Sequence, residues 1–125
     1  MKEQNQQNQL IKVSLLAVPE APLSGISGIY DVFKFFKHVV PDARPFQVEI
    51  IAPTHTLLST ASGLPLNAHK TVSEVSDTDI VIVPSLVLNN GKWLAGRYPE
   101  AVAWLRRMYQ QGATLCSACS GMLLL

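Results

Sequence analysis

The stretch that decides the fold is SACSG, residues 117–121. Apolar and small residues precede it over 113–116, and an apolar run over 122–125 follows it. Small side chains thus flank Cys119, which is typical of a nucleophile elbow, where a sharp turn from strand to helix admits only small neighbours and pushes the central side chain outward. We therefore expect Cys119 in an exposed cleft at the end of a strand. A helix amino terminus would stabilise its thiolate there, and neighbouring N–H groups could hold an oxyanion.

Other roles for the two cysteines remain open from the sequence alone. Cys119 also fits a small buried core residue, and its C-x-x-C spacing with Cys116 allows a dithiol redox pair or a zinc site. Zinc would need two further ligands, and His38, His55 and His69 are scattered without ligand spacing. We therefore predict no metal and no cofactor, and we interpret Cys116 as a strand residue that packs inward.

Working outward from the elbow, four apolar segments have the length and composition of buried strands. They are Leu10–Val18, Phe46–Ala52, Asp79–Val83 and Ala113–Ala118. Residues 54–78 contain Ser, Thr, Gly63 and Pro65 between short apolar pieces, which indicates a small hairpin or excursion.

Two helices are predicted between these strands. In the first, from Gly28 to Val40, apolar residues recur at steps of three and four: Ile29, Val32, Phe33, Phe36 and Val40. In the second, Pro99 takes the first helical position and Gly112 ends the helix. Its expected apolar stripe is Ala101, Val102, Leu105, Met108 and Tyr109. The order of elements predicts an α/β fold of the flavodoxin-like type, an open, mostly parallel sheet with helices on both faces.

Composition limits the classes of function. The chain has 125 residues, of which 48% are hydrophobic and 15% charged, which suits one globular domain over residues 10–125. The net charge is +1 and no basic run occurs, which argues against direct binding to nucleic acid or to a membrane surface. Residues 1–9 form a polar lead that we expect to be disordered, without the apolar centre of a signal peptide, so a cytoplasmic protein is predicted.

Several motifs together resemble the ThiJ/PfpI superfamily, whose fold is class I glutamine amidotransferase-like. They are the elbow, Gly28–Phe33 after the first strand, Gly63–Leu66, and Asp79–Pro84 before a loop. Within that superfamily the chain is most similar to the sensor domains that precede AraC-type DNA-binding domains. The resemblance implies a site around Cys119 formed with Gly25, Ser85, Leu86, Ser120 and Gly121.

The sequence departs from the pattern of the family's enzymes at two places. Those enzymes carry an acid after the first strand, and the matching position here is Gly25. Glu20 could replace that acid only if the loop took a different path. The turn after the third strand reads Pro84-Ser85-Leu86 instead of a Pro-Gly-Gly-like turn. The family's usual histidine partner would lie beyond Leu125, and the apolar end of the chain leads us to expect that the domain is incomplete there.

The resemblance therefore implies a sensor and dimerisation domain of a regulator. Such a domain would bind a small metabolite near Cys119 and form a homodimer, and DNA would be bound only by a domain outside this chain. The alternatives are a cysteine-nucleophile enzyme of the amidase, hydratase or deglycase type, and a redox sensor in which Cys116 resolves an oxidised Cys119.

Overall fold

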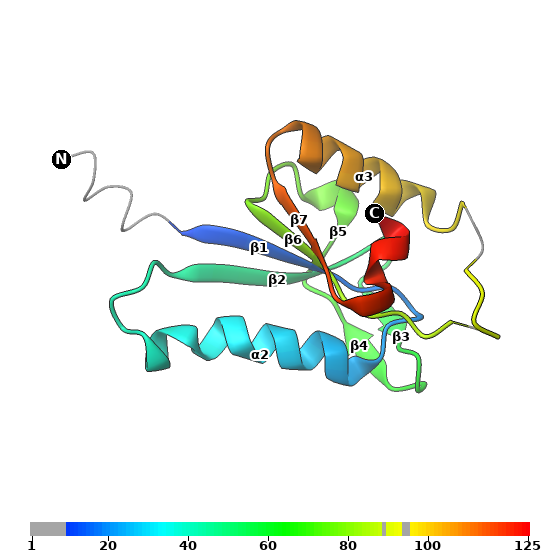
Figure 1. The fold of residues 1–125 in the computed structure, drawn as a ribbon, viewed down its shortest axis with the longest axis horizontal. Helices are drawn as coiled ribbons and strands as arrows, with labels where there is room; N and C mark the ends of the chain where they lie inside the picture. Colours follow the sequence, from blue (N-terminus) through cyan, green and yellow to red (C-terminus); the bar gives the residue numbers. More distant parts are fainter. Residues whose placement is uncertain (1–9, 89, 94–95) are drawn as a thin grey trace.

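The computed structural model describes residues 10–88, 90–93 and 96–125. A five-stranded sheet in the order β5-β2-β1-β6-β7 forms its centre (Figure 1). The strands are β1 (Ile11–Leu16), β2 (Phe46–Ala52), β5 (Lys70–Thr71), β6 (Ile80–Val83) and β7 (Thr114–Ser117). All four pairings are parallel, so the predicted parallel α/β fold is confirmed.

Strand β6 is apolar at every position, and its neighbour β1 ends in the fully buried pair Leu15 and Leu16. Leu15 of β1 lies between Ile50 of β2 and Ile82 of β6 in the register of the sheet. Val81 and Val83 of β6 are fully buried. Continuous apolar runs of this kind are what a strand in the middle of a parallel sheet requires.

Helix α2 (Leu23–Val39) covers one face of the sheet, and α3 (Pro99–Gln110) lies on the other (Figure 1). The predicted start of α2 at Gly28 was wrong by one and a half turns. The helix begins directly after Pro22, and Ile26 is its one buried residue among those described. The sequence did not indicate this first turn, because Ser24 and Gly25 are both poor helix formers.

The predicted apolar stripe of α2 is correct only in part. Phe33 and Phe36 pack edge-on against Phe46 of β2, with ring centroids 4.9 and 5.4 Å apart. Val32 is exposed, and Val40 follows the helix and is also exposed.

Helix α3 begins as predicted, with Pro99 in its first turn. Ala101, Trp104, Leu105 and Met108 form its buried face. Tyr109 does not belong to that face, because 67% of its surface is exposed. The helix ends at Gln110, and Gly112 follows with a φ of +98°, a conformation that glycine adopts without strain.

The predicted excursion over 54–78 contains a hairpin. Strand β3 (Leu57–Ser59) pairs antiparallel with β4 (Pro65–Asn67), and Gly63 in the connecting turn has a φ of +87°. The chain then rejoins the sheet as β5 and continues into a short 3-10 helix, η1 (Val72–Glu74). The hairpin lies at the carboxyl end of the sheet, beside the loops that follow β1 and β6 (Figure 1).

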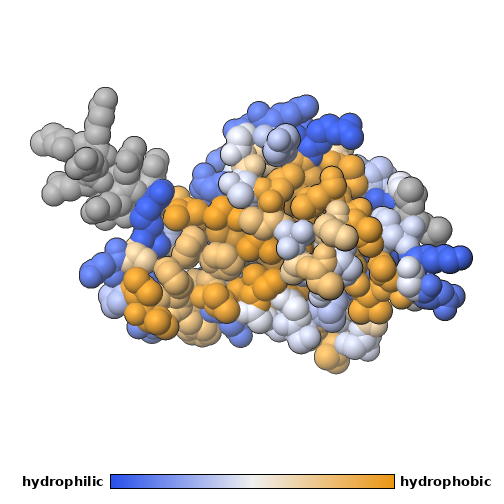
Figure 2. Space-filling view, in the orientation of Figure 1, coloured by the Kyte–Doolittle hydropathy of each residue, from blue (hydrophilic) through white to orange (hydrophobic). Residues whose placement is uncertain are grey.

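The end of the chain differs from expectation in two ways. Cys116, predicted to pack inward, is exposed, because β7 is an edge strand with little of its surface covered. The expected helix after the elbow is the six-residue 3-10 helix η2 (Cys119–Leu124). Its residues Met122 and Leu123, together with Leu125, are exposed, and apolar atoms gather on the face occupied by β7 and η2 (Figure 2).

Candidate functional site

The backbone of Cys119 has the geometry of a nucleophile elbow. Ala118 is still extended, with its N–H donating to the carbonyl of Val83 at 2.9 Å, and Cys119 then turns to a φ of +48°. A positive φ in a residue other than glycine is uncommon, costs about 1 to 3 kcal/mol and concentrates at functional sites. The side chain of Cys119 is exposed. The turn therefore presents a thiol to solvent at the carboxyl end of β7.

Gly121 explains why the elbow needs small residues. A Cβ atom added at Gly121 would lie 2.4 Å from the carbonyl oxygen of Val83 and 2.5 Å from that of Pro84. Both atoms belong to the backbone and cannot rotate away. Gly121 is thus buried against the end of β6, and its lack of a side chain allows this close approach.

Ser120 connects the elbow to the loop after β6. Its hydroxyl accepts a hydrogen bond from the N–H of Leu86 at 2.7 Å and donates one to the carbonyl of the same residue at 2.8 Å. The Leu86 side chain is buried in the core. These two hydrogen bonds join the elbow to the loop after β6, and they occupy both the amide of Leu86 and the hydroxyl of Ser120.

The remaining two predicted site residues also lie together. Gly25 is in the first turn of α2, and a Cβ added there would be 3.5 Å from the Oγ of Ser85. Ser85 is only partly buried and precedes Leu86 directly. The loops after β1, β6 and β7 thus bring Gly25, Ser85 and the elbow to one edge of the sheet, where the carboxyl ends of parallel strands commonly form binding sites.

The acid that could have replaced the missing carboxylate at Gly25 is engaged elsewhere. One carboxylate oxygen of Glu20 accepts a hydrogen bond from the hydroxyl of Tyr98, and the other forms an ion pair with the guanidinium of Arg97. The Glu20 side chain is only 14% exposed. Both of its oxygens are therefore occupied by groups from the segment that leads into α3.

This cluster of Glu20, Arg97 and Tyr98 was missed by the sequence reasoning. Tyr98 has a φ of +54°, a left-handed conformation that is rare for an aromatic residue. Burial, and then the hydrogen bond and charge of Glu20, raise the pKa of the Tyr98 hydroxyl well above its ordinary value, and the charge of Arg97 partly opposes this. The available signal was the pair Arg97-Tyr98 directly before Pro99, opposite an acid in the loop after a buried strand.

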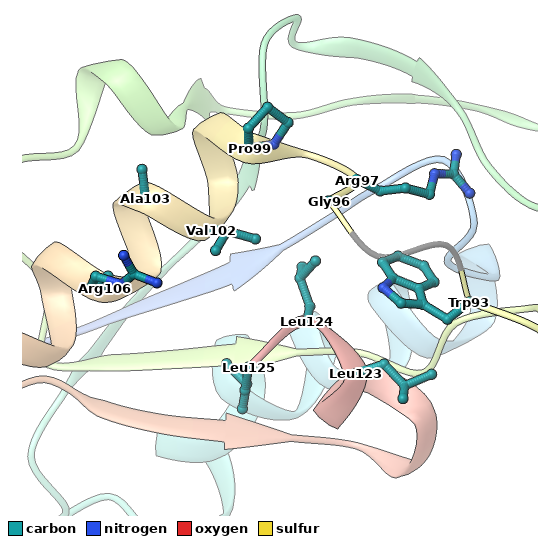
Figure 3. Close-up of a pocket in the computed structure, with 10 residues that line it drawn as sticks. All are labelled: Trp93, Gly96, Arg97, Pro99, Val102, Ala103, Arg106, Leu123, Leu124 and Leu125. Atoms are coloured by element: carbon teal, nitrogen blue, oxygen red, sulfur yellow. The ribbon is translucent and has the colours of Figure 1, made fainter.

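A cavity of about 480 Å³ lies between α3 and the end of the chain (Figure 3). Val102 and Leu124 face each other across it, and Trp93 and Arg97 border one side. A smaller cavity of about 260 Å³ also has Trp93 and Arg97 in its wall, together with Glu20. Residues of η2 that follow the elbow line the larger cavity, but Cys119 lines neither of them.

Neither a metal site nor a membrane span is found in residues 10–88, 90–93 and 96–125. Within these ranges no three His, Cys, Asp or Glu side chains gather as metal ligands would. In the same part of the chain, no helix combines the length and the apolar character that a membrane span needs.

No family model matches the sequence, and no curated protein matches it. Solved structures do match the fold. A putative transcriptional regulator from Vibrio parahaemolyticus superposes with a TM-score of 0.72 at 15% identity, over 93% of this chain and 60% of that one. An AraC family transcriptional regulator from Pseudomonas putida gives 0.69 at 16% identity, over 91% of this chain and 68% of that one. Oxidized DJ-1 from Toxoplasma gondii gives 0.71 at 14% identity, over 92% and 59%.

A ThiJ/PfpI family protein from Pseudomonas syringae has a TM-score of 0.71 at 18% identity, and this chain covers 46% of its length. The chain thus spans about half to two thirds of these structures. The resemblance inferred from the elbow and its neighbouring motifs is confirmed at the level of the fold. This chain has the fold of the ThiJ/PfpI and DJ-1 superfamily, which the AraC-family regulator structure shares.

Proposed function

We propose that this chain is the amidotransferase-like sensor and dimerisation domain of an AraC-type transcription regulator. It binds a small metabolite beside Cys119, and a part of the protein outside this chain binds DNA. The fold supports this proposal, because regulators from two bacteria superpose on more than nine tenths of the chain.

The observation that carries the proposal is an exposed elbow cysteine combined with an acid, Glu20, whose carboxylate is already paired within the part of the chain that the structure describes. The strained turn at Cys119 presents the thiol, whereas the position that would supply a proton-holding carboxylate is Gly25. Glu20 is held by Arg97 and Tyr98. General acid–base catalysis needs a group that can exchange a proton at the reacting atom. A site that presents the thiol while Glu20 is already paired is better suited to binding than to turnover.

The net charge of +1 also favours the regulator with a separate DNA-binding part. A surface that grips the phosphates of DNA needs several clustered Lys and Arg residues, and each phosphate contact adds to the salt dependence of binding. Arg106 and Arg107 form only a two-residue basic run in the sequence. DNA binding is therefore assigned to another domain of the same protein.

A second candidate is a redox sensor, which one observation favours. Cys116 and Cys119 are both exposed, so an oxidant could reach the first thiol and the second could attack it. In that reaction a peroxide oxidises one thiol to a sulfenic acid with release of water, and the other thiol then displaces a second water to form a disulfide. Intact-mass analysis after mild peroxide treatment distinguishes this function, because the disulfide lowers the mass by two hydrogens.

The proposal is tested with the full-length protein in two assays. In the first, the protein is incubated with small amides, nitriles and α-oxoaldehydes, and we expect no turnover above that of Cys119→Ser. In the second, binding to the DNA upstream of its own gene is measured in wild type and in Cys119→Trp, with Cys116→Trp as the matched control. We expect a metabolite extract to change DNA binding in wild type and in Cys116→Trp, but not in Cys119→Trp. Cysteine-dependent turnover, or an extract that changes DNA binding equally in all three proteins, would contradict the proposal.

A further inference from the structure

The smaller of the two cavities beside Arg97 has the composition of a site for an organic anion. Its walls include Glu20, Val87, Leu88, Lys92, Trp93 and Arg97, and its volume is about 260 Å³. We name it the Arg97 cavity. Cys119 does not line it, so a ligand in this cavity would be distinct from the metabolite proposed to bind beside Cys119.

Arg97 is held in place by three neighbours. Its guanidinium pairs with Glu20 and donates to the hydroxyl of Tyr98 at 3.3 Å. Its central carbon lies 5.5 Å from the ring centre of Trp93 and 5.2 Å from that of Tyr98. A guanidinium has five N–H donors in a fixed plane, so these contacts orient the group and leave further donors for a ligand. Figure 3 shows the side chains of Arg97 and Trp93 next to each other.

Lys92 adds a second positive charge to the cavity. Among the described residues its side chain makes no hydrogen bond or ion pair, whereas Arg97 is already paired with Glu20. The three ionised groups of the wall, Glu20, Lys92 and Arg97, therefore sum to one positive charge. An anion that enters the cavity would gain the attraction of Lys92, whose ammonium group is not paired with any residue that the structure describes.

Trp93 and two aliphatic side chains provide the apolar part of the wall. Val87 and Leu88 line the cavity together with the Trp93 ring, which is partly buried and packs against the core. Aromatic rings favour stacked or edge contacts with other planar groups. The volume is below the usual range of about 300 to 1,000 Å³ for sites of drug-sized ligands, which limits the occupant to a small molecule.

From this combination we propose that the Arg97 cavity binds a small planar carboxylate, with the carboxylate between Lys92 and Arg97 and the flat body against Trp93. The positive charges of Lys92 and Arg97 favour a carboxylate group, and the Trp93 indole favours a flat ring attached to it. A neutral molecule of the same shape or a compact inorganic anion would satisfy only one of the two requirements.

Benzoate is the probe for the test, and 19F NMR of the full chain labelled with 5-fluorotryptophan is the readout. Trp93 is partly exposed and Trp104 fully buried, so the solvent isotope shift between H₂O and D₂O assigns the two resonances. We expect benzoate to shift the Trp93 resonance saturably and to leave that of Trp104 in place. Benzamide, which keeps the shape without the charge, and inorganic phosphate, which keeps charge without the ring, should give no saturable shift.

The variant Lys92→Gln tests the charge. Loss of one charge-assisted contact is expected to weaken benzoate binding about tenfold. Lys37→Gln is the matched control, because Lys37 is an exposed lysine on α2, and we expect it to bind benzoate as wild type does. No saturable shift with benzoate, an equal response to benzamide or phosphate, or equal affinity in the two lysine variants would each overturn the proposal and would leave the function proposed for Cys119 unaffected.

Discussion

The hydroxyl of Ser120 holds both backbone groups of Leu86, accepting from its N–H at 2.7 Å and donating to its carbonyl at 2.8 Å. The two residues are 34 positions apart in the sequence. One belongs to the turn that presents Cys119, and the other to the loop that leaves β6. The turn that presents the thiol is therefore held by a contact with the loop after β6 as well as by its own backbone.

Ser120→Ala is expected to destabilise the protein and to loosen the elbow. The substitution leaves the partly buried N–H of Leu86 without its partner, which costs about 1 to 3 kcal/mol. Urea unfolding measures the change in the free energy of unfolding. Ser27→Ala, on the exposed side of α2, is the control and should change it by only a few tenths of a kcal/mol in the stabilising direction. Equal stability of the two variants would contradict the role given to Ser120.

Gly121→Ala is expected to be more disruptive than its small added volume suggests. The new methyl group would lie 2.4 Å from the carbonyl oxygen of Val83, so the backbone of the elbow or of β6 must move. Overpacking of this kind costs about 1 to 3 kcal/mol.

Gly28→Ala is the matched control for that substitution. Gly28 is in α2, and a Cβ added there would meet nothing within 4 Å, so the variant should gain about 0.5 to 1 kcal/mol of stability. Thermal unfolding of wild type and the two alanine variants measures both effects in one experiment. We expect a lower melting temperature for Gly121→Ala and a higher one for Gly28→Ala. A Gly121→Ala protein as stable as wild type would show that the close approach to β6 is not required.

Tyr98 gives the protein a pH dependence at the alkaline end. Its pKa is raised in the folded protein by burial and by Glu20, so folding favours the protonated phenol. The stabilisation is fully present below the unfolded pKa of about 10 and is lost as the pH rises above that value. Wild type should therefore lose stability between about pH 9 and pH 11 more steeply than Tyr98→Phe, which has no phenol to ionise. Parallel curves for the two proteins in urea unfolding at each pH would contradict this account.

The architecture was predictable where local sequence marks an element clearly. Ile80–Val83 is apolar at every position, as a strand with both faces covered must be, and Pro99 marks the start of α3 directly. The start of α2 was not predictable, because Ser24 and Gly25 have low helix propensity and tertiary contacts of Ile26 override it. The exposure of Cys116 also could not be read from the sequence, since nothing local indicates that β7 lies at the edge.

The candidate site was predictable at the elbow and not around Glu20. Small residues beside Cys119 indicate a tight turn, because a tight turn excludes large ones. The contacts of Glu20 with Arg97 and Tyr98 join positions more than seventy residues apart and depend on the path of the loop before α3, for which the sequence holds no periodic signal. The same limit applies to Gly121, whose importance follows from the position of β6 rather than from its neighbours in sequence.

The central claim is that a small molecule binds over Cys119, and alkylation of the two exposed cysteines tests it most directly. The full-length protein is treated with iodoacetamide with and without a metabolite extract, and modification of Cys119 and of Cys116 is followed by peptide mass spectrometry. We predict that the extract slows modification of Cys119, by about tenfold when the ligand is at ten times its Kd, and leaves Cys116 unchanged as the internal control. An extract that slows neither cysteine, or both equally, would contradict the claim.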